Sequence, residues 1–426
     1  MFKYYTSLQL HWQILIALLL AIFAGLLSGE ERALFGVTFY SVFDFFGTLF
    51  LNALKMLIVP LIVSSIIVGI MGIGSGDNLS RLGGKTLGYY AISSFLAIIT
   101  GLILVNLTMP GISDGQPLKE VIGLADVPAA VTQSVEGKGS SDIVAVFLRM
   151  VPANIVSAAA QGQMLGLIFF SLLFGFFMTK LKGAKAEVMQ NFWQAVLDVM
   201  MHMTNWVMKF APIGVFALVA KVVASSGIGV FVPLAVFFLT VIAALAVHFI
   251  FTMSLVLRYV AKVNPLLHYK AMSPALLTAF STSSSSATLP LTMECVEHKA
   301  GVSNRVTSFT LPLGATVNMD GTALYECVGA MFIAQAYGLD LTFTTQFTIV
   351  LVALVTSIGV AGIPSASLVA ISIILGAIGL PLEGIGLILA VDRVLDMCRT
   401  AVNVFSDSVA AIVIGKLEGE TGILKG

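Results

Sequence analysis

Long stretches without a charged side chain constrain this sequence more than any other feature. The regions 222–257 and 150–179 contain no Asp, Glu, Lys or Arg. A helix of about 20 apolar residues already crosses the hydrocarbon core of a bilayer. Over the whole chain 58% of the residues are hydrophobic and 10% are charged, against about 25% charged in soluble domains. The sequence therefore predicts an all-α membrane protein with several spans.

Apolar runs predict six ordinary spans before residue 260, at about 14–27, 42–73, 87–109, 150–179, 192–223 and 229–259. We interpret the first as a retained span rather than a signal peptide, because no A-x-A cleavage site follows it. The connector 110–142 is rich in Gly, Asp and Ser, which predicts an exposed loop.

Basic residues gather on one side of these spans, which predicts a cytoplasmic N-terminus by the positive-inside rule. They are Lys3, Arg81, Lys85, Lys180, Lys182, Lys185, Arg258, Lys262 and Lys270. The three cysteines have no metal-type spacing and cannot all pair, so they predict no disulfide framework. No nucleotide or nucleic-acid motif appears, and we expect no cofactor and no nucleic-acid partner.

The last 160 residues contain two interrupted apolar segments. Two short apolar pieces flank FSTSSSSATLP (280–290), and two more flank SIGVAGIPSAS (357–367). Each is expected to be a hairpin that enters the membrane and turns back, since irregular backbone at that depth must be buried in protein or line a cavity. Such a matched pair indicates an inverted-repeat transporter, and helix N-termini at the tips suit a carboxylate.

Polar residues inside the remaining apolar segments predict binding sites. Asp320 lies between Gly314 and Gly321, glycines that predict an unwound stretch whose carbonyl oxygens, with Asp320, suit a hard cation. A kinked structural helix is the alternative, but it leaves Asp320 unexplained. Farther on, five polar residues share an arc of about 80° on one predicted helix: Asp392, Asp396, Arg399, Asn403 and Asp407. Charges at membrane depth are costly, so this stripe should line a ligand or ion pathway.

Several of these motifs resemble the dicarboxylate/amino acid:cation symporter family, the glutamate and aspartate transporters. The resemblance rests on TSSSSATLPLTM, LPLGATVNMDGTALY, SIGVAGIPSAS and LDMCRTAVNV, with NALKMLIVP and APIGVFAL earlier in the chain. It covers essentially the whole chain and implies eight transmembrane helices plus two re-entrant helical hairpins with inverted repeats, in an elevator-type homotrimer.

The resemblance also implies a division into a rigid scaffold and a mobile transport domain. Residues 1–80 (spans 1 and 2) and 142–224 (spans 4 and 5, with the trimer contacts) would form the scaffold, and 111–141 an extracellular-side loop. The transport domain would comprise 81–110 (span 3) and 225–426, the latter with span 6, hairpin 1 at about 265–299, span 7, hairpin 2 at about 343–381 and span 8.

Site roles follow from the same resemblance. Arg399 is similar to the arginine that pairs with the substrate side-chain carboxylate. A planar guanidinium suits this role because it can donate two parallel hydrogen bonds to a carboxylate. Asp396 would accept the substrate ammonium, and Asn403 with Ser285 would hold the α-carboxylate. The full implied substrate set is Ser284, Ser285, Thr322, Val360, Gly362, Asp396, Arg399, Thr400 and Asn403.

Three implied sodium sites use oxygen ligands, as a hard cation requires. They comprise Gly314, Asn318, Asn403 and Asp407; Thr316, Ser357, Ile358 and Val360; and Tyr90, Ser93, Ser94, Asn318 and Asp320. The core of the implied transport domain contains four aspartates but only two arginines. Bound cations or protons should therefore offset the excess negative charge during transport.

Three positions depart from the family pattern. Archaeal members carry an extra arginine where this chain has Ser283, and animal members carry it where this chain has Met397. Arg393 is a candidate to replace it in part; a structural ion pair with a neighbouring aspartate is the equal alternative. Glu326, where archaeal members tend to have Gln, is a proton-coupling candidate, unless it is permanently paired with a basic residue.

These features together predict a symporter, not an enzyme, in the plasma (inner) membrane of a prokaryote. It would import L-glutamate or L-aspartate, coupled to Na⁺, H⁺ or both, with the lipid bilayer and two further copies of the chain as partners. A C4-dicarboxylate:cation symporter is the nearest alternative, although Asp396 would then lack an ammonium. An ion channel is more distant. So is an intramembrane serine protease, suggested by the serines at 281 and 283–286, because no GxSG-type setting appears.

Overall fold

The structure, a computed structural model, describes residues 10–71, 77–113, 115–122, 151–161, 164–226, 231–339, 341–357, 366–378, 380 and 384–424. Within these residues the fold is almost entirely helical, which confirms the predicted class. The described strands form two short antiparallel hairpins, β1 (Ala33–Leu34) with β2 (Val37–Thr38) and β3 (Ile112–Ser113) with β4 (Gln116–Pro117).

The first three predicted spans are the long helices of the N-terminal region. They are α2 (Leu10–Ser28), α3 (Phe39–Met71) and α4 (Asp77–Thr108), followed by the short α5 (Leu118–Ile122). Pro60 lies inside α3. Ser64 donates its hydroxyl back to the carbonyls of Pro60 and Leu61 at 2.7 and 3.1 Å, the usual contact of a helical serine with the preceding turn.

The next two predicted spans are each interrupted. The region 150–179 contains α8 (Ile155–Ala160) and α9 (Met164–Met178), and the region 192–223 is covered by α10 (Ala184–Met208) and α11 (Ala211–Ser226). The predicted span 192–223 thus consists of two helices separated by Lys209 and Phe210. Pro212 cannot donate a backbone hydrogen bond to the preceding turn, so the α10 helix ends and a new one begins just before it.

The sixth span is continuous but not uniformly α-helical. It runs through α12 (Phe231–Ala246), the π-helical turn η2 (Val247–Thr252), α13 (Met253–Leu255) and a second π-helical turn, η3 (Val256–Val260). By length and composition, three helical stretches of the described chain can cross a membrane: Leu82–Thr108, Val232–Val260 and Val391–Leu417.

Both interrupted segments contain paired helices. The first has α14 (Pro265–Thr282), α15 (Ser285–Glu294) and the π-helical turn η4 (Cys295–Lys299), and the second has α18 (Phe343–Ser357) and α19 (Ala366–Ile378). The serine-rich connector is far shorter than the predicted stretch 280–290, because only Ser283 and Ser284 lie outside the helices. Ser283 adopts a left-handed conformation with φ 51° and ends α14, which lets the chain reverse. The second tip, 358–365, lies outside the described residues.

The predicted unwound stretch is present but limited to two residues. Helix α16 (Asn304–Val317) ends at Asn318, and α17 (Asp320–Ala336) begins after Met319. The last helix, α20 (Ile385–Leu417), carries the polar stripe. Gly314 and Gly321 are themselves helical, so the prediction that these glycines provide the unwinding is wrong.

Close packing explains both glycines. A Cβ atom at Gly321 would lie 2.7 Å from the Arg399 carbonyl oxygen, and one at Gly314 would lie 2.5 Å from Asp407 Oδ1. Both clashes are with α20. The missing side chains therefore let this helix approach α16 and α17 closely enough for polar contacts between them.

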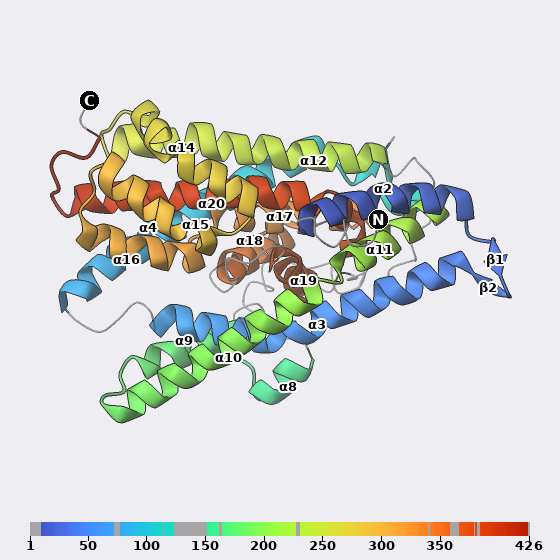
Figure 1. The fold of residues 1–426 in the computed structure, drawn as a ribbon, viewed down its shortest axis with the longest axis horizontal. Helices are drawn as coiled ribbons and strands as arrows, with labels where there is room; N and C mark the ends of the chain where they lie inside the picture. The colour runs from blue at the N-terminus through green and yellow to red at the C-terminus, as the bar shows by residue number, and fades with distance from the viewer. Residues whose placement is uncertain are drawn as a thin grey trace.

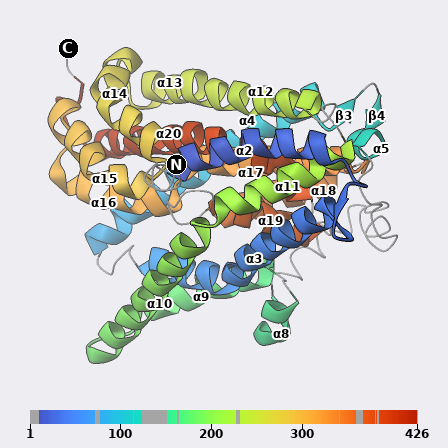
Figure 2. The same ribbon diagram turned by 45° about the vertical axis from the view of Figure 1, so that its right-hand side comes forward.

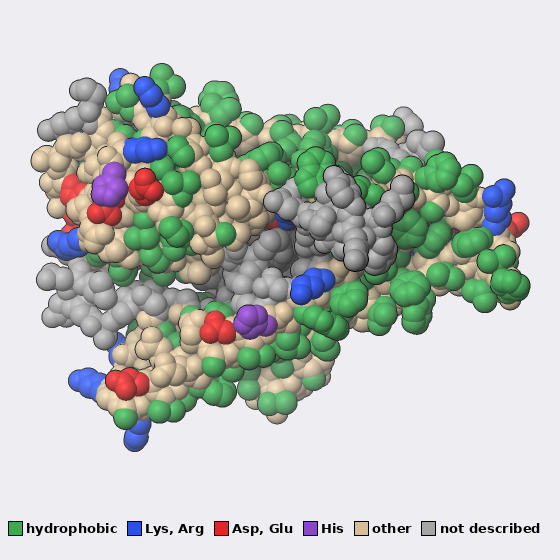
Figure 3. Space-filling view, viewed as in Figure 1, with side chains coloured by type: hydrophobic (Ala, Val, Ile, Leu, Met, Phe, Trp, Pro, Cys, Tyr) green, Lys and Arg blue, Asp and Glu red, His purple; other side chains and the backbone are tan. Residues whose placement is uncertain are grey.

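The helices pack in two groups. Helix α3 packs against α9, α10 and α11, and α11 packs against α2, whereas α20 packs against α12, α14, α16 and α17, and α17 packs against α4. Figures 1 and 2 show α20 running along the long axis between α12 and the α15–α16 pair, with α3, α9 and α10 below them. The two groups touch where α11 meets α20 and where α3 and α9 meet α19. On the face drawn in Figure 3 the charged side chains are few and lie mainly towards the two ends of that axis.

Candidate functional site

The polar stripe of α20 faces the protein interior. Asp392, Asp396, Arg399, Asn403 and Asp407 are each at most 5% exposed. They project from one long helix that packs against α12, α14, α16 and α17, so the spacing along α20 distributes them over several neighbouring elements. The stripe therefore forms a line of buried polar contacts.

Arg399 is held between two carboxylates. Its Nη1 donates to Asp392 Oδ1 at 3.0 Å and its Nη2 donates to Asp396 Oδ1 at 2.7 Å. The guanidinium carbon lies 4.0 Å from the centre of the Tyr325 ring, a cation–π contact. Its Nε has no hydrogen-bond partner among the described residues. A buried guanidinium with one unused donor suits a further anionic group.

Arg393 contacts the same carboxylate cluster. Its Nη1 donates to Asp396 Oδ2 at 3.3 Å, and the residue is 8% exposed. Its Nε likewise has no partner within the described chain. Asp396 thus has a guanidinium on each oxygen. Arg393 therefore forms the ion pair of the structural prediction. It also lies in the cluster where it could partly replace the extra arginine of other family members.

Asn403 caps the N-terminus of α17 from the side. Its Oδ1 accepts the backbone N–H groups of Gly321 and Thr322 at 2.8 and 3.3 Å, and its Nδ2 donates to Thr322 Oγ1 at 3.0 Å. These N–H groups have no partner within their own helix, and they carry the positive end of the helix dipole. This contact brings Thr322 and Asn403 together as predicted. Thr400 instead donates its hydroxyl to the Asp396 carbonyl at 2.8 Å.

The tip of the first hairpin, between α14 and α15, contains two of the predicted substrate residues. Ser284 caps α15, its Oγ accepting the Ala287 N–H at 3.2 Å, and Ser285 is 4% exposed. Helix α15 packs against α20. The predicted residues Ile358, Val360 and Gly362 fall in the second tip, outside the described residues.

Asp320 is the centre of a second polar cluster. Its Oδ2 accepts hydrogen bonds from Ser93, from Ser406 at 2.6 Å and from His248 Nε2, which lies 3.1 Å away, while its Oδ1 accepts from Ser94 at 2.7 Å. The two serines of α4 were predicted. Ser406 and His248 were missed, although Ser406 lies beside Asp407 on the same helix and its position could have suggested a role.

Asn318 joins the Asp320 cluster to the stripe. Its Nδ2 donates to Asp407 Oδ1 at 2.9 Å and to Ser406 Oγ at 3.0 Å. Its Oδ1 is buried and has no hydrogen-bond partner among the described residues. Tyr90 donates its hydroxyl to the Thr310 carbonyl at 2.7 Å, and its oxygen would lie 2.9 Å from a Cβ on Gly314. Two of the three predicted sodium sets therefore adjoin at Asn318.

The donor set fits an alkali cation better than a transition metal. No group of three or more His, Cys, Asp or Glu within the described chain could hold a metal ion. Two aspartates, serine hydroxyls and the unused Asn318 carbonyl oxygen are hard ligands. Thr316 and Ser357, from the remaining set, donate their hydroxyls to carbonyls of their own helices at 3.0 Å.

Glu326 is fully buried on α17. Its Oε2 accepts the Thr356 hydroxyl at 2.9 Å, and its Oε1 has no hydrogen-bond partner among the described residues. None of the ion pairs found in the described chain includes Glu326. Its observed partner is thus a neutral hydroxyl on hairpin 2 rather than the basic residue of the alternative prediction.

Neither buried histidine forms a serine-protease arrangement. His268 Nε2 lies 2.9 Å from Ser408 Oγ, a serine that sequence spacing did not place near it. Its Nδ1, however, has no partner within the described chain, so the acid that orients a catalytic histidine is missing there. Ser408 is completely buried.

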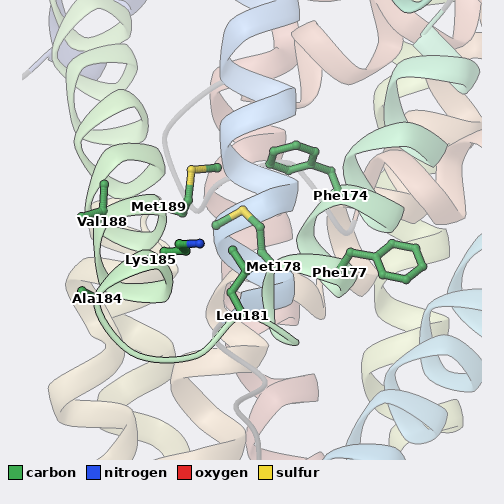
Figure 4. A pocket seen from close by; sticks show the side chains of 8 residues that line it. All are labelled: Phe174, Phe177, Met178, Leu181, Ala184, Lys185, Val188 and Met189. Atoms are coloured by element: carbon green, nitrogen blue, oxygen red, sulfur yellow. The ribbon is translucent and has the colours of Figure 1, made fainter.

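A surface groove lies elsewhere in the molecule. It has a volume of about 660 Å³ between α9 and α10, and Figure 4 shows Met178 of α9 close to Lys185 and Met189 of α10. None of the predicted site residues lines it. The chemical groups capable of binding a polar ligand are in the buried clusters instead.

The chain is similar to known transporters over nearly its whole length. The chain is 38% identical to the proton/sodium-glutamate symport protein of Geobacillus stearothermophilus, over 99% of this chain and 97% of that protein. It is 37% identical to the proton/glutamate-aspartate symporter of Escherichia coli (96% and 93% covered) and 36% identical to excitatory amino acid transporter 3 of Homo sapiens (94% and 84%). The model of the sodium:dicarboxylate symporter family matches residues 10–417. The chain therefore belongs to the sodium:dicarboxylate symporter family.

Proposed function

We propose that this chain is a secondary active symporter that imports L-glutamate or L-aspartate together with Na⁺, H⁺ or both. The observation that carries the proposal is the buried Arg399 guanidinium, held by Asp392 and Asp396 on the helix whose Asn403 caps α17. Relatives named as glutamate or glutamate-aspartate symporters support the same substrate class.

Substrate binding would exchange the partners of this cluster. The substrate side-chain carboxylate takes Arg399, which releases Asp396 to accept the substrate ammonium. Exchange of this kind keeps Arg399 and Asp396 each paired with an opposite charge, which matters because an unpaired buried charge costs about 3–5 kcal/mol. Thr322 and the dipole at the α17 N-terminus lie on the same side of α20 as Asn403, and they supply donors for a carboxylate.

Cations would balance the charge of the loaded site. Asp320 and Asp407 accept hydrogen bonds from hydroxyl, amide and imidazole groups, and no arginine or lysine pairs with either within the described chain. The substrate brings two carboxylates and one ammonium, so it adds net negative charge. Na⁺ at Asn318, Asp320 and Asp407, and a proton on Glu326, are the proposed compensation.

The movement would be of the elevator type within a homotrimer. The packing of α20 against α12, α14, α16 and α17, and of α3 against α9, α10 and α11, supports a transport group that moves against a scaffold. The expected setting is a prokaryotic inner membrane with the N-terminus in the cytoplasm.

Reconstituted liposomes test this function. Labelled aspartate and glutamate uptake is measured with Na⁺ and proton gradients imposed separately; uptake driven by either gradient is expected, and its absence with both refutes symport. Counterflow of unlabelled against labelled substrate separates a carrier from a channel. Succinate, which has no ammonium to pair with Asp396, should compete poorly; strong succinate uptake with none for either amino acid would favour the C4-dicarboxylate alternative.

A further inference from the structure

His248 is completely buried against Asp320, and none of the site roles above uses it. Both residues are 0% exposed, and His248 Nε2 lies 3.1 Å from Asp320 Oδ2. We propose that His248 is a positioning residue of the cation site, which holds the Asp320 carboxylate in place while the neighbouring serine hydroxyls turn towards the ion. This inference rests on the proposed cation coupling.

The backbone around His248 is unusual in a way that suits such a role. His248 lies in the π-helical turn η2, a rare conformation that is found frequently at functional sites. The carbonyl of the next residue, Phe249, accepts the Tyr269 hydroxyl at 2.5 Å. This side-chain donor from hairpin 1 satisfies the backbone of the irregular turn, as membrane-embedded backbone requires.

The Oδ2 oxygen of Asp320 has no acceptor capacity left. A carboxylate offers about two lone-pair sites on each oxygen, and Oδ2 accepts from Ser93, Ser406 and His248, whereas Oδ1 accepts only from Ser94. A cation that binds to Oδ2 must therefore take up an electron pair that one of these donors now uses. A hydroxyl can rotate and present its own lone pair to the ion, so each serine is able to change from donor to ligand.

His248 cannot change in this way. Its Nδ1 is buried and has no hydrogen-bond partner among the described residues, whereas its Nε2 faces a carboxylate oxygen. A buried N–H without an acceptor is costly, so in the neutral ring the proton belongs on Nε2. His248 then donates to Asp320 before and after the ion binds, and this constant contact fixes the direction of the carboxylate.

The test measures Na⁺ binding to purified protein without substrate. Half-saturation is obtained from the Na⁺-dependent rise in Tm, since a ligand that binds the folded state stabilises it. His248→Leu is expected to weaken Na⁺ binding about 10–100-fold, the usual effect of losing a group that orients a metal ligand. His248→Gln, whose amide N–H can reach the same oxygen, should restore most of the affinity.

His268 provides a matched control. It is equally buried, its Nε2 lies 2.9 Å from Ser408 Oγ, and its Nδ1 also has no partner in the described chain. His268→Leu should therefore cost comparable stability but leave the Na⁺ half-saturation unchanged. If His248→Leu is not recovered folded, the shorter His248→Asn, whose amide does not reach Asp320, must show the weakening.

Asp320→Asn separates the two proposals. Na⁺ binding that is lost in Asp320→Asn but unchanged in His248→Leu overturns the histidine role and leaves cation coupling intact. Equal weakening in His248→Leu and His268→Leu, or a folded His248→Gln no better than His248→Leu, also overturns it. A parental protein that shows no Na⁺ response overturns the sodium coupling together with the histidine role.

Discussion

At the scale of single residues, the carboxylate cluster around Arg399 decides what the site can recognise. Two aspartates and two arginines are buried together, and each carboxylate contacts at least one guanidinium. The cluster is therefore neutral when all four groups are charged. A ligand carrying both an ammonium and a carboxylate can enter it without leaving any of these charges unpaired.

Replacing Arg399 by serine removes the counter-charge for the substrate side chain. Aspartate affinity should fall by about 100-fold or more, since losing one partner of a buried pair costs about 3–5 kcal/mol, while small neutral amino acids should begin to bind. Equilibrium binding of labelled aspartate and serine measures both effects. Arg305→Ser, at an arginine whose side chain is 62% exposed, is the control, and unchanged aspartate affinity in Arg399→Ser would disprove the assignment.

Replacing Arg393 by alanine distinguishes its two predicted roles. If Arg393 supports Asp396 in the substrate site, aspartate binding should weaken about tenfold, in line with 1–3 kcal/mol for a charge-assisted hydrogen bond. If it is a purely structural partner, Tm should fall with binding retained. Binding and thermal unfolding are measured on the same sample, with Asp396→Asn as the reference for a lost ammonium acceptor. We expect the binding defect.

At the scale of elements, the contact of α20 with α16 and α17 organises both clusters. The break at Asn318 and Met319 turns the Asn318 side chain towards Asp407 and exposes the α17 N-terminus to Asn403. These contacts need the two helices very close together, which Gly314 and Gly321 allow. The helices thus act on the site through their spacing as well as their side chains.

Gly321→Ala tests this spacing. The new Cβ would lie 2.7 Å from the Arg399 carbonyl oxygen and 3.1 Å from Val402 Cβ, so α20 must shift. Overpacking of this kind costs about 1–3 kcal/mol, and displacing Asn403 should weaken substrate binding as well. Gly84→Ala in α4, where a Cβ meets nothing within 4 Å, is the control and should be neutral or slightly stabilising. A Gly321→Ala protein with parental Tm and affinity would contradict the close-packing argument.

At the scale of the whole molecule, the proposed elevator movement raises the question of which ions accompany the substrate. Glu326 projects from α17 towards hairpin 2, where its Oε2 accepts the Thr356 hydroxyl. Its Oε1 has no hydrogen-bond partner in the described chain. A proton on that oxygen would remove a negative charge from the transport domain, which crosses the membrane interior in the proposed elevator movement. Its position therefore connects proton binding to hairpin 2, whose tip contains the predicted substrate residues Val360 and Gly362.

Glu326→Gln should still bind and exchange substrate, because Gln keeps an oxygen for the Thr356 hydroxyl. Net uptake should lose its response to an inward proton gradient, since the amide cannot carry the proton. Uptake and exchange in liposomes at imposed pH gradients are the measurements, with Glu297→Gln as the control at a partly exposed glutamate. An unaltered response to the pH gradient in Glu326→Gln would exclude it as the proton carrier.

The sequence by itself determined the properties that depend on local pattern. Charge-free runs indicated membrane spans, the spacing from Asp392 to Asp407 placed one buried polar face on a helix, and the two interrupted segments indicated hairpins. The resemblance to the symporter family rested largely on the motifs around Asp320 and Arg399. Each of these signals is contained within a short stretch of chain, because helix periodicity and membrane thickness act on consecutive residues.

The tertiary structure decided what depends on contacts between distant segments. His248 and Asp320 are 72 positions apart, and Ser406 is 86 positions from Asp320, so no periodicity links them. The same holds for the reason that Gly314 and Gly321 are glycines, which lies in the backbone and side chains of α20 rather than in their own turns. Buried polar groups must find partners wherever packing brings them, and that packing is a property of the whole fold.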